Sequence, residues 1–238
     1  MKHFYTDHGL SGMWLISLYK ICILRTYMVL KELNIPFEVT EVSGRPKPDW
    51  YLRINPRGKV PAIRIPQLNN QVIYESAICC EYLCDAAVQQ TLMPNDPMQR
   101  AIIRLLNDHC DTMFTKTQFT YLMNNDIEKD KELVTAMEDA LLMYEEQLEK
   151  SGGPFLMGEH FTLSDIHVLP FILRLVVSLK HFKNYELLSD KFPKFLAWYE
   201  LCSKRESVMA AALTGKFTYM LSLLIIFHCV CLCKYHIL

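Results

Sequence analysis

The chain has 238 residues, of which 25 are basic and 26 acidic, and 51% are hydrophobic. This length suffices for one large folded domain or two small ones, and the composition excludes a disordered or collagen-like protein. The formal net charge of -1 provides no global positive field. We therefore expect no nucleic-acid partner, and instead a small ligand or a protein partner.

The cysteines show no metal-binding spacing. They are odd in number and lie at Cys22, Cys79, Cys80, Cys84, Cys110, Cys202, Cys229, Cys231 and Cys233, without a repeated CxxC or a Cys/His pattern. The first fourteen residues, MKHFYTDHGLSGMW, lack the basic end and apolar core of a secretion signal. We therefore predict no metal site and reduced thiols in a cytoplasmic protein.

The N-terminal part of the chain begins with a predicted strand, helix and strand. An apolar run at Met13–Tyr19 predicts a buried strand. Apolar residues at i, i+4 and i+7 from Ile23 to Leu30 predict a helix that ends near Asn34, which can adopt the left-handed cap conformation. Alternating apolar and polar residues predict a half-buried strand at Phe37–Val42.

A predicted hairpin and a second helix follow. Prolines at positions 46 and 48 predict a break in the chain before a turn at Asn55–Gly58. Val60–Ile65 predicts a short strand, and Asn69-Asn70 predicts the turn into the next strand. A helix is expected from about Ser76 to Ala87. The resulting β-α-β-β-α order outlines a thioredoxin-like domain.

Strand patterns disappear after Met93–Pro97, which has the proline content of a linker. Apolar residues repeat at helical spacing through Asp126–Lys150, and the two glycines that follow predict the end of that helix. Thr162–Asp165 predicts a capping box before the apolar helix at Ile166–Leu179. We therefore predict a first domain at residues 1–92 and an all-helical domain at residues 98–215.

Residues 216–238 form a hydrophobic tail whose role stays open. Residues 217–233 carry no charge and contribute much of the positive mean hydropathy of +0.08. As a helix these seventeen residues would span roughly 25 Å, slightly less than the roughly 30 Å of a bilayer core. Membrane contact through residues 217–233, tethering the chain to an intracellular membrane, is therefore the alternative to a cytoplasmic location.

Paired motifs of the N-terminal part resemble the glutathione-binding core of the cytosolic glutathione transferases. The motifs are Asn55–Pro61 (NPRGKVP), Ile73–Ile78 (IYESAI) and Glu81–Leu83 (EYL). Together with Lys47–Trp50 (KPDW) and Arg25-Thr26, they look most like the omega class, over about residues 23–213. The resemblance implies a fold of class α/β plus all-α: a thioredoxin-like domain followed by an all-helical domain. It also implies a homodimer.

The resemblance assigns glutathione to four residues. A Val60-Pro61 pair with a cis bond would turn the backbone of Val60 outward, where the cysteinyl backbone of glutathione could pair with it. Glu75 and Ser76 would hold the γ-glutamyl end, since a helix start suits its carboxylate. Lys47 would reach the glycine carboxylate. Each assignment has a structural alternative. Val60-Pro61 would then simply end an edge strand, Glu75 and Ser76 would form an ordinary helix cap, and Lys47 would be a solvated surface residue.

The expected nucleophile departs from the family pattern. Omega transferases carry a catalytic cysteine five residues before the arginine that matches Arg25, and this chain has Lys20 there. With a loop shorter by two residues, Cys22 would lie at a helix start beside Lys20, where both would stabilise a thiolate. It would then form a mixed disulfide with glutathione. The alternatives are an inert buried Cys22, or a hydroxyl of Ser17 or Tyr19 that activates glutathione.

The resemblance implies glutathione as co-substrate, with a small electrophile or oxidant as the second substrate. The expected activity is that of a thioltransferase and dehydroascorbate reductase acting through Cys22. One alternative is a protein that binds glutathione but is catalytically weakened because it lacks a competent nucleophile. Another is a membrane-tethered protein, in which the tail decides the location and the altered first helix abolishes the chemistry. No electrophile can be named from these residues.

Other reactive side chains have structural explanations. Three cysteines lie on the helix after the second motif: Cys79, Cys80 and Cys84. One helical face cannot hold all three, and we interpret them as small buried apolar residues. Ser164 and His167 adjoin the Thr162–Asp165 cap, and we interpret them as part of its structure rather than as catalytic residues.

Overall fold

A four-stranded sheet forms the centre of the N-terminal domain in the computed structural model, which describes residues 13–16, 21–42, 46–87 and 92–213. The strands are β1 Met13–Ile16, β2 Phe37–Thr40, β3 Ala62–Ile65 and β4 Gln71–Tyr74, in the order β2-β1-β3-β4. β1 is parallel to β2, β3 is antiparallel to β1, and β4 is antiparallel to β3. This topology, with its helices, is the predicted thioredoxin-like domain.

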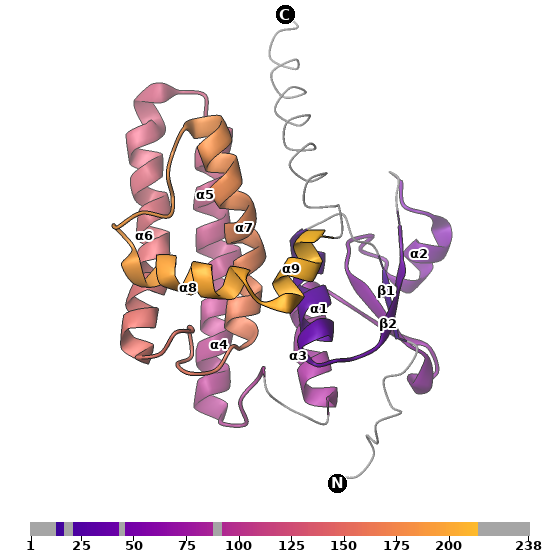
Figure 1. Cartoon of the computed structure of the whole chain (residues 1–238). Coiled ribbons are helices and arrows are strands. Elements are labelled where there is room, and N and C mark those ends of the chain that lie inside the picture. The colour runs from indigo at the N-terminus through magenta and orange to yellow at the C-terminus, as the bar shows by residue number, and fades with distance from the viewer. Residues whose placement is uncertain (1–12, 17–20, 43–45, 88–91, 214–238) are drawn as a thin grey trace, which may run out of the picture.

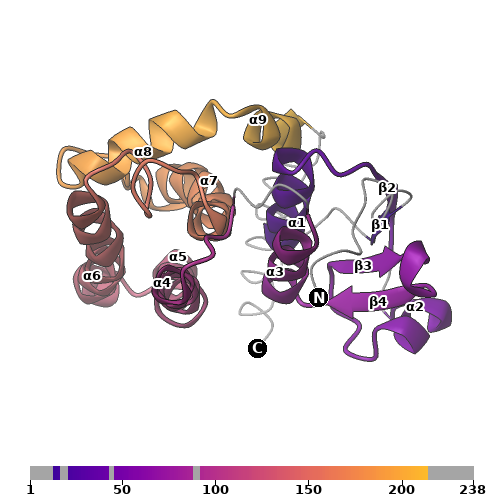
Figure 2. The same ribbon diagram turned by 90° about the horizontal axis from the view of Figure 1, so that it is seen from below.

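Two helices of this domain, α1 Ile21–Glu32 and α3 Ser76–Ala86, pack against each other between the sheet and the helical domain (Figure 2). The short helix α2 Asp49–Ile54 lies across the sheet from them. The prolines at positions 46 and 48 predicted only a break in the chain, and no helix was expected after them. Pro48 instead directly precedes the helix, where its missing N–H costs nothing, and six residues are too few to show a helical period.

The predicted helix end at Asn34 and the predicted turn at Asn69-Asn70 are confirmed, whereas the predicted burial pattern of β2 is not. α1 ends before Asn34, which has a φ of 53°. Asn69 and Asn70 also have positive φ angles, and they follow the 3-10 turn η1 Pro66–Leu68 in the connection from β3 to β4. The predicted burial of Val39 is wrong, because its side chain is 39% exposed. β2 is an edge strand, so a β-branched residue there is not covered as it would be in a central strand.

The C-terminal domain is built from helices, as predicted (Figure 1). They are α4 Pro97–His109, the π-helical turn η2 Cys110–Phe114, α5 Thr115–Met123, α6 Ile127–Ser151, α7 Leu163–Lys183, α8 Pro193–Ser203 and α9 Glu206–Leu213. Asp126 caps the start of α6, and Gly152 ends it with a φ of 69°. The periodicity and the two glycines therefore located this helix correctly.

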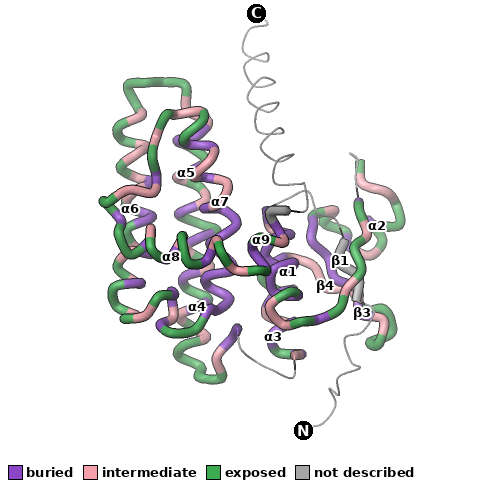
Figure 3. The backbone as a smooth tube through the Cα atoms, in the orientation of Figure 1, coloured by how far each residue is buried: buried purple, intermediate pink, exposed green. Residues whose placement is uncertain are grey.

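α7 is the central helix of the molecule and is buried along most of its length (Figure 3). It contacts α1 of the first domain as well as α4, α5 and α8. The predicted capping box is present, and the backbone N–H of Thr162 donates to Asp165 at 2.8 Å. α7 thus places side chains from the C-terminal domain directly against the start of α1.

None of the helices in the described ranges is long and apolar enough to cross a membrane. The predicted tail at residues 216–238 lies outside the described residues, as do Ser17, Tyr19 and Lys20.

Candidate functional site

Three of the predicted glutathione residues lie at one end of the sheet. The Val60-Pro61 peptide bond is cis, and β3 begins at the next residue. Ala62 at the start of β3 pairs with Tyr74 at the end of β4. Val60, just before β3, therefore lies near Glu75 and Ser76, just after β4. The hairpin register brings the two motifs together although fifteen residues separate Val60 from Glu75.

Glu75 has an unusual backbone conformation for a side chain of its size, with a φ of 73°. Such strain in a residue other than glycine is found most often at functional sites. Its carboxylate accepts a hydrogen bond of 2.8 Å from Nη1 of Arg57, so the two form an ion pair. Ser76 is the first residue of α3. The pairing of Arg57 with Glu75 was not predicted, because no local pattern in the sequence indicates it.

Lys47 lies beside the turn that leads to Val60. Its Nζ donates to the carbonyl of Val42 at 2.8 Å. A Cβ built on Gly58 would be 3.9 Å from Cγ of Lys47, and the positive φ of 60° at Gly58 itself favours glycine. The structure thus places the side chain of Lys47 beside Gly58, in the turn that precedes Val60.

The turn before Val60 is held by side chains that the motif did not explain. Nδ2 of Asn55 donates to the carbonyl of Lys59 at 2.6 Å and to the hydroxyl of Tyr51 at 3.2 Å, and Asn55 is only 1% exposed. The Tyr51 hydroxyl donates to the same carbonyl. These contacts fix the residue that precedes Val60, so α2 contributes to the site through Tyr51.

Cys22 is the second residue of α1 and is half-buried with a free thiol. It lies in the first helical turn, a position that both the catalytic and the inert interpretation of Cys22 allow. Arg25, one turn later, donates to the hydroxyl of Ser76 at 3.4 Å. This contact places the first turns of α1 and α3 side by side, with Cys22 at one and Ser76 at the other.

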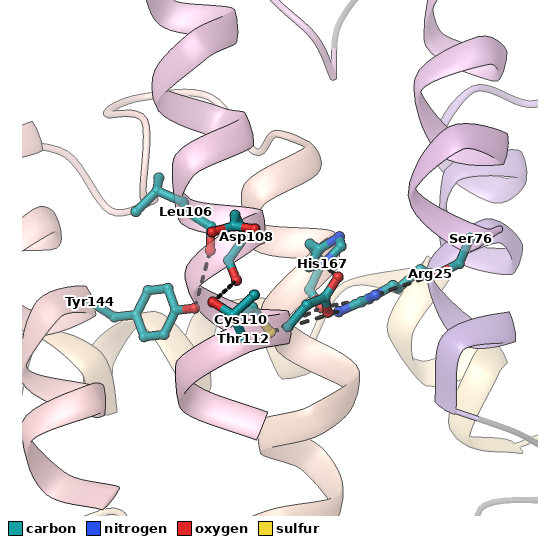
Figure 4. A network of polar contacts seen from close by, with 9 residues as sticks. Arg25, Ser76, Leu106, Asp108, Cys110, Thr112, Tyr144 and His167 are labelled. Carbon is teal, nitrogen blue, oxygen red and sulfur yellow. Dashed lines mark hydrogen bonds and ion pairs between the residues drawn. The ribbon is translucent and has the colours of Figure 1, made fainter. Parts of the chain in front are cut away.

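Arg25 also connects the two domains (Figure 4). Its Nε donates to the carbonyl of His167 at 2.9 Å, and its Nη2 lies 2.8 Å from Oδ1 of Asp111 and 3.7 Å from Sγ of Cys110. Oδ2 of Asp111 is 3.0 Å from Nε2 of His167. His167, interpreted from the sequence as part of a helix cap, is instead a member of this interdomain network.

The charges in the network follow from burial and from Arg25. Burial and the nearby guanidinium lower the pKa of His167 to about 4. Burial alone would raise the pKa of Asp111, but hydrogen bonding to His167 and the charge of Arg25 lower it to about 2. At neutral pH the network therefore holds a neutral histidine, with Asp111 ionised against Arg25.

The ligand atoms of Cys110, Asp111 and His167 all lie within 4.8 Å of one another, close enough to bind one metal ion. Arg25 already provides a positive charge to the same carboxylate and lies next to the thiol. Burial raises the pKa of Cys110 to about 11, which keeps the sulfur protonated. This donor set suits a hydrogen-bonded network better than a divalent cation.

The three cysteines of α3 are buried, as predicted. All of Cys79, Cys80 and Cys84 are buried because α3 is covered on more than one side, by the sheet, α1 and α7. Burial raises the pKa of each thiol, that of Cys80 to about 12. Protonated, buried thiols are poor nucleophiles, so these residues serve packing.

Comparison with known proteins agrees with this architecture. The glutathione S-transferase N-terminal domain model matches residues 22–86, and the glutathione S-transferase C-terminal domain model matches residues 109–206. Pyrimidodiazepine synthase of Drosophila melanogaster is 29% identical over 188 residues, which are 78% of this chain and 74% of that protein. Glutathione S-transferase omega-2 of Rattus norvegicus is 34% identical over 155 residues, which are 64% of this chain and 61% of that protein.

Solved structures show the same likeness. Glutathione transferase Omega 3C from Trametes versicolor superposes with a TM-score of 0.75 at 27% identity, covering 86% of this chain and 87% of its own. Omega-class proteins are thus among both the sequence relatives and the structural neighbours. Because the N-terminal and C-terminal domain models of one family match successive parts of the chain, the chain belongs to the glutathione S-transferase family.

Proposed function

We propose that this protein is an omega-like glutathione transferase that catalyses glutathione-dependent thiol transfer and dehydroascorbate reduction through Cys22. The observation that carries the proposal is the position of Cys22 in the first turn of α1, beside the start of α3. A thiol at a helix start is stabilised as a thiolate by the free N–H groups and the helix dipole. The strained backbone of Glu75 just before α3 supports a functional site at this position, where we propose that glutathione binds.

Glutathione is proposed to bind along the end of the sheet. The backbone of Val60 would pair with the cysteinyl part of the peptide, as an added strand does. Ser76 at the start of α3 would hold the γ-glutamyl carboxylate, and Glu75 its ammonium group. Lys47, beside the same turn, would exchange its contact with the Val42 carbonyl for the glycine carboxylate.

With dehydroascorbate, the Cys22 thiolate would add to a carbonyl carbon, and a glutathione thiolate would then attack Sγ of Cys22. The C–S bond would break, its electron pair would leave with the reduced substrate as ascorbate, and a disulfide between Cys22 and glutathione would remain.

With a mixed disulfide as substrate, the proposed chemistry consists of two thiol–disulfide exchanges, of which the second is common to both substrates. The Cys22 thiolate attacks the glutathione sulfur of a mixed disulfide, forms a bond to it and releases the substrate thiolate, which takes a proton from solvent. A second glutathione thiolate then attacks the glutathione sulfur on Cys22. The bond to Cys22 breaks, the electron pair returns to Sγ of Cys22, and glutathione disulfide leaves.

A glutathione-binding protein without this chemistry is the alternative. It is favoured by the place of Cys22 as the second residue of α1, flanked by buried Ile21 and Ile23, rather than in the loop before the helix. In that case the site would bind glutathione, and the thiol would take no part in turnover.

Substitution of Cys22 by serine separates the two functions. We expect Cys22→Ser to lower glutathione-dependent reduction of a small disulfide and of dehydroascorbate by about a hundredfold or more, since the hydroxyl cannot form the mixed disulfide. Glutathione binding, measured by calorimetry, should persist. Cys202→Ala, which removes a buried thiol on α8, is the matched control and should retain turnover per folded molecule. Unchanged turnover in Cys22→Ser would leave the binding function as the better description.

A further inference from the structure

Arg57 and Glu75 form an ion pair whose two charged groups remain accessible to a ligand. Nη1 of Arg57 lies 2.8 Å from Oε1 of Glu75, and the two side chains are 61% and 31% exposed. Among the described residues, this is the one hydrogen bond that the guanidinium makes. A pair in contact with solvent contributes little to stability, because water screens both charges. Stability therefore does not explain an ion pair at this position.

The backbone is held in place at both members of the pair. The N–H of Arg57 donates to Oδ1 of Asn55 at 3.2 Å, and Asn55 is itself 1% exposed and bonded to the carbonyl of Lys59. Glu75 lies between β4 and α3 with a φ of 73°, a conformation that costs free energy in a residue other than glycine. The structure thus presents two charged side chains from fixed positions, while their ends contact solvent.

We propose that Arg57 is a specificity-determining residue, which binds the α-carboxylate at the γ-glutamyl end of glutathione. This inference rests on the proposed glutathione site. The γ-glutamyl end carries an ammonium and a carboxylate on one carbon atom, so its two charges lie side by side, as do those of Arg57 and Glu75. The ligand would bind with its charges in the opposite order, the ammonium at Glu75 and the carboxylate at Arg57.

Each group has the hydrogen-bonding capacity that this arrangement needs. The guanidinium has further N–H donors besides the one directed to Glu75, and the carboxylate of Glu75 has a second oxygen, Oε2, for the ammonium. The carboxylate of the ligand also has two oxygens, so one can bind at Ser76 while the other binds Arg57. The ion pair between Arg57 and Glu75 can therefore persist in the complex, and each charge has a partner of opposite sign.

This arrangement selects a ligand by both of its charges. A peptide with the ammonium alone would bring a positive charge close to Arg57 without the carboxylate that offsets it. A peptide with the carboxylate alone would bring a negative charge close to Glu75. The site should therefore prefer peptides that begin with a free α-amino acid, joined through its side-chain carboxyl group, over peptides in which either charge is missing.

The test measures by calorimetry how tightly S-methylated peptides bind, so that the thiol chemistry of Cys22 takes no part. The peptides are S-methylglutathione and its analogue with 4-aminobutanoyl in place of γ-glutamyl, which lacks only the α-carboxylate. We expect Arg57→Met to raise the Kd of S-methylglutathione about tenfold, because it removes a charge-assisted hydrogen bond. The Kd of the 4-aminobutanoyl analogue should stay the same or fall. Arg57→Lys, which keeps the charge but not the fork of donors, should restore part of the affinity.

Arg53→Met, which removes another exposed arginine from the same domain, is the matched control and should leave both Kd values unchanged. Thermal unfolding shows whether each variant is folded, and Arg57→Gln replaces Arg57→Met if the latter is not. Equal weakening of both peptides would show a general effect of charge and overturn the inference, as would unchanged or tighter binding of S-methylglutathione. In these cases the proposed glutathione site stands, because the wild-type protein still binds the peptide. A wild-type protein that does not bind S-methylglutathione would refute that site, and this inference with it.

Discussion

Arg25 shows how much one side chain can do when it is buried. It is 2% exposed, yet it is charged and contacts Ser76 in its own domain and His167 and Asp111 in the other. Removing a buried charge from water costs several kcal/mol unless partners replace the lost hydration. Here the carboxylate of Asp111 and the carbonyl of His167 replace it, so the domain contact depends on the protonation state of this network.

Acid should weaken the protein through His167. Its pKa is 6.5 when exposed and about 4 in the folded protein. Because the unfolded chain binds the proton first, the stabilisation is complete above about 6.5 and is lost as the pH falls toward about 4. Asp111, whose pKa is also lowered, adds to the loss only below its ordinary value of 3.8. We expect the free energy of unfolding to fall by about 2 kcal/mol between neutral pH and pH ~4.5, as measured in urea.

His167→Gln provides the control for this pH dependence. Glutamine does not titrate, so the variant should lose stability at neutral pH but change much less between the two pH values. An equal slope in both proteins would show that other groups cause the acid sensitivity.

α7 illustrates how a helix can begin inside a protein. Asp165 is fully buried and accepts hydrogen bonds from the backbone N–H groups of Leu156 and Thr162 and from Nε1 of Trp198, at 2.8 to 3.0 Å. These donors come from the preceding loop, the cap residue and α8. The carboxylate therefore joins three elements, in addition to capping its own helix.

Substituting this carboxylate should cost more than substituting an exposed cap. We expect Asp165→Ala to lower the free energy of unfolding by about 3 kcal/mol, because it leaves buried donors without an acceptor. Asp126→Ala, at the exposed start of α6, should cost about 1 kcal/mol or less, since water can replace the lost contact with Glu128. Urea denaturation of both variants measures the difference, and equal losses would refute the role assigned to burial.

At the scale of the whole molecule, one side of α3 and α4 exposes apolar side chains. They are Ile78 on α3, Met98 and Leu105 on α4, and Met113 on η2. Ile78 is one turn before Glu81, which pairs with Arg104 on α4, so the apolar residues flank an ion pair that joins the two domains. Clustered exposed apolar residues on a soluble protein commonly mark an interface. We propose this surface as the contact of the predicted homodimer.

Leu105, which is 69% exposed, tests this surface. We expect light scattering to give the wild-type protein about twice the mass of its 27.8 kDa chain, and Leu105→Glu the mass of a single chain, because a glutamate would be desolvated in the contact. Leu142→Glu, on the outer helix α6 with 42% exposure, should remain dimeric. A monomeric wild-type protein would contradict the predicted assembly.

Much of the fold could be predicted because its determinants are local. Asn34 and Gly152 end their helices through the left-handed conformation of single residues, and the Thr162–Asp165 cap needs only its own four residues. The motif from Asn55 to Pro61 likewise located a turn whose hydrogen bonds are mostly internal. α2 was missed because six residues carry no measurable period.

The sequence by itself determined the β-α-β-β-α core, the helical nature of the second part of the chain and the family, since these depend on periodicity, caps and motifs within short stretches. Only the tertiary structure decided which charges meet. Arg57 pairs with Glu75 inside the first domain, and Arg25 pairs with Asp111 of the other domain, 86 positions further along the chain. Such contacts depend on how α1, α3 and α7 pack, and packing is set by the sum of many weak contacts along whole helices rather than by a local pattern.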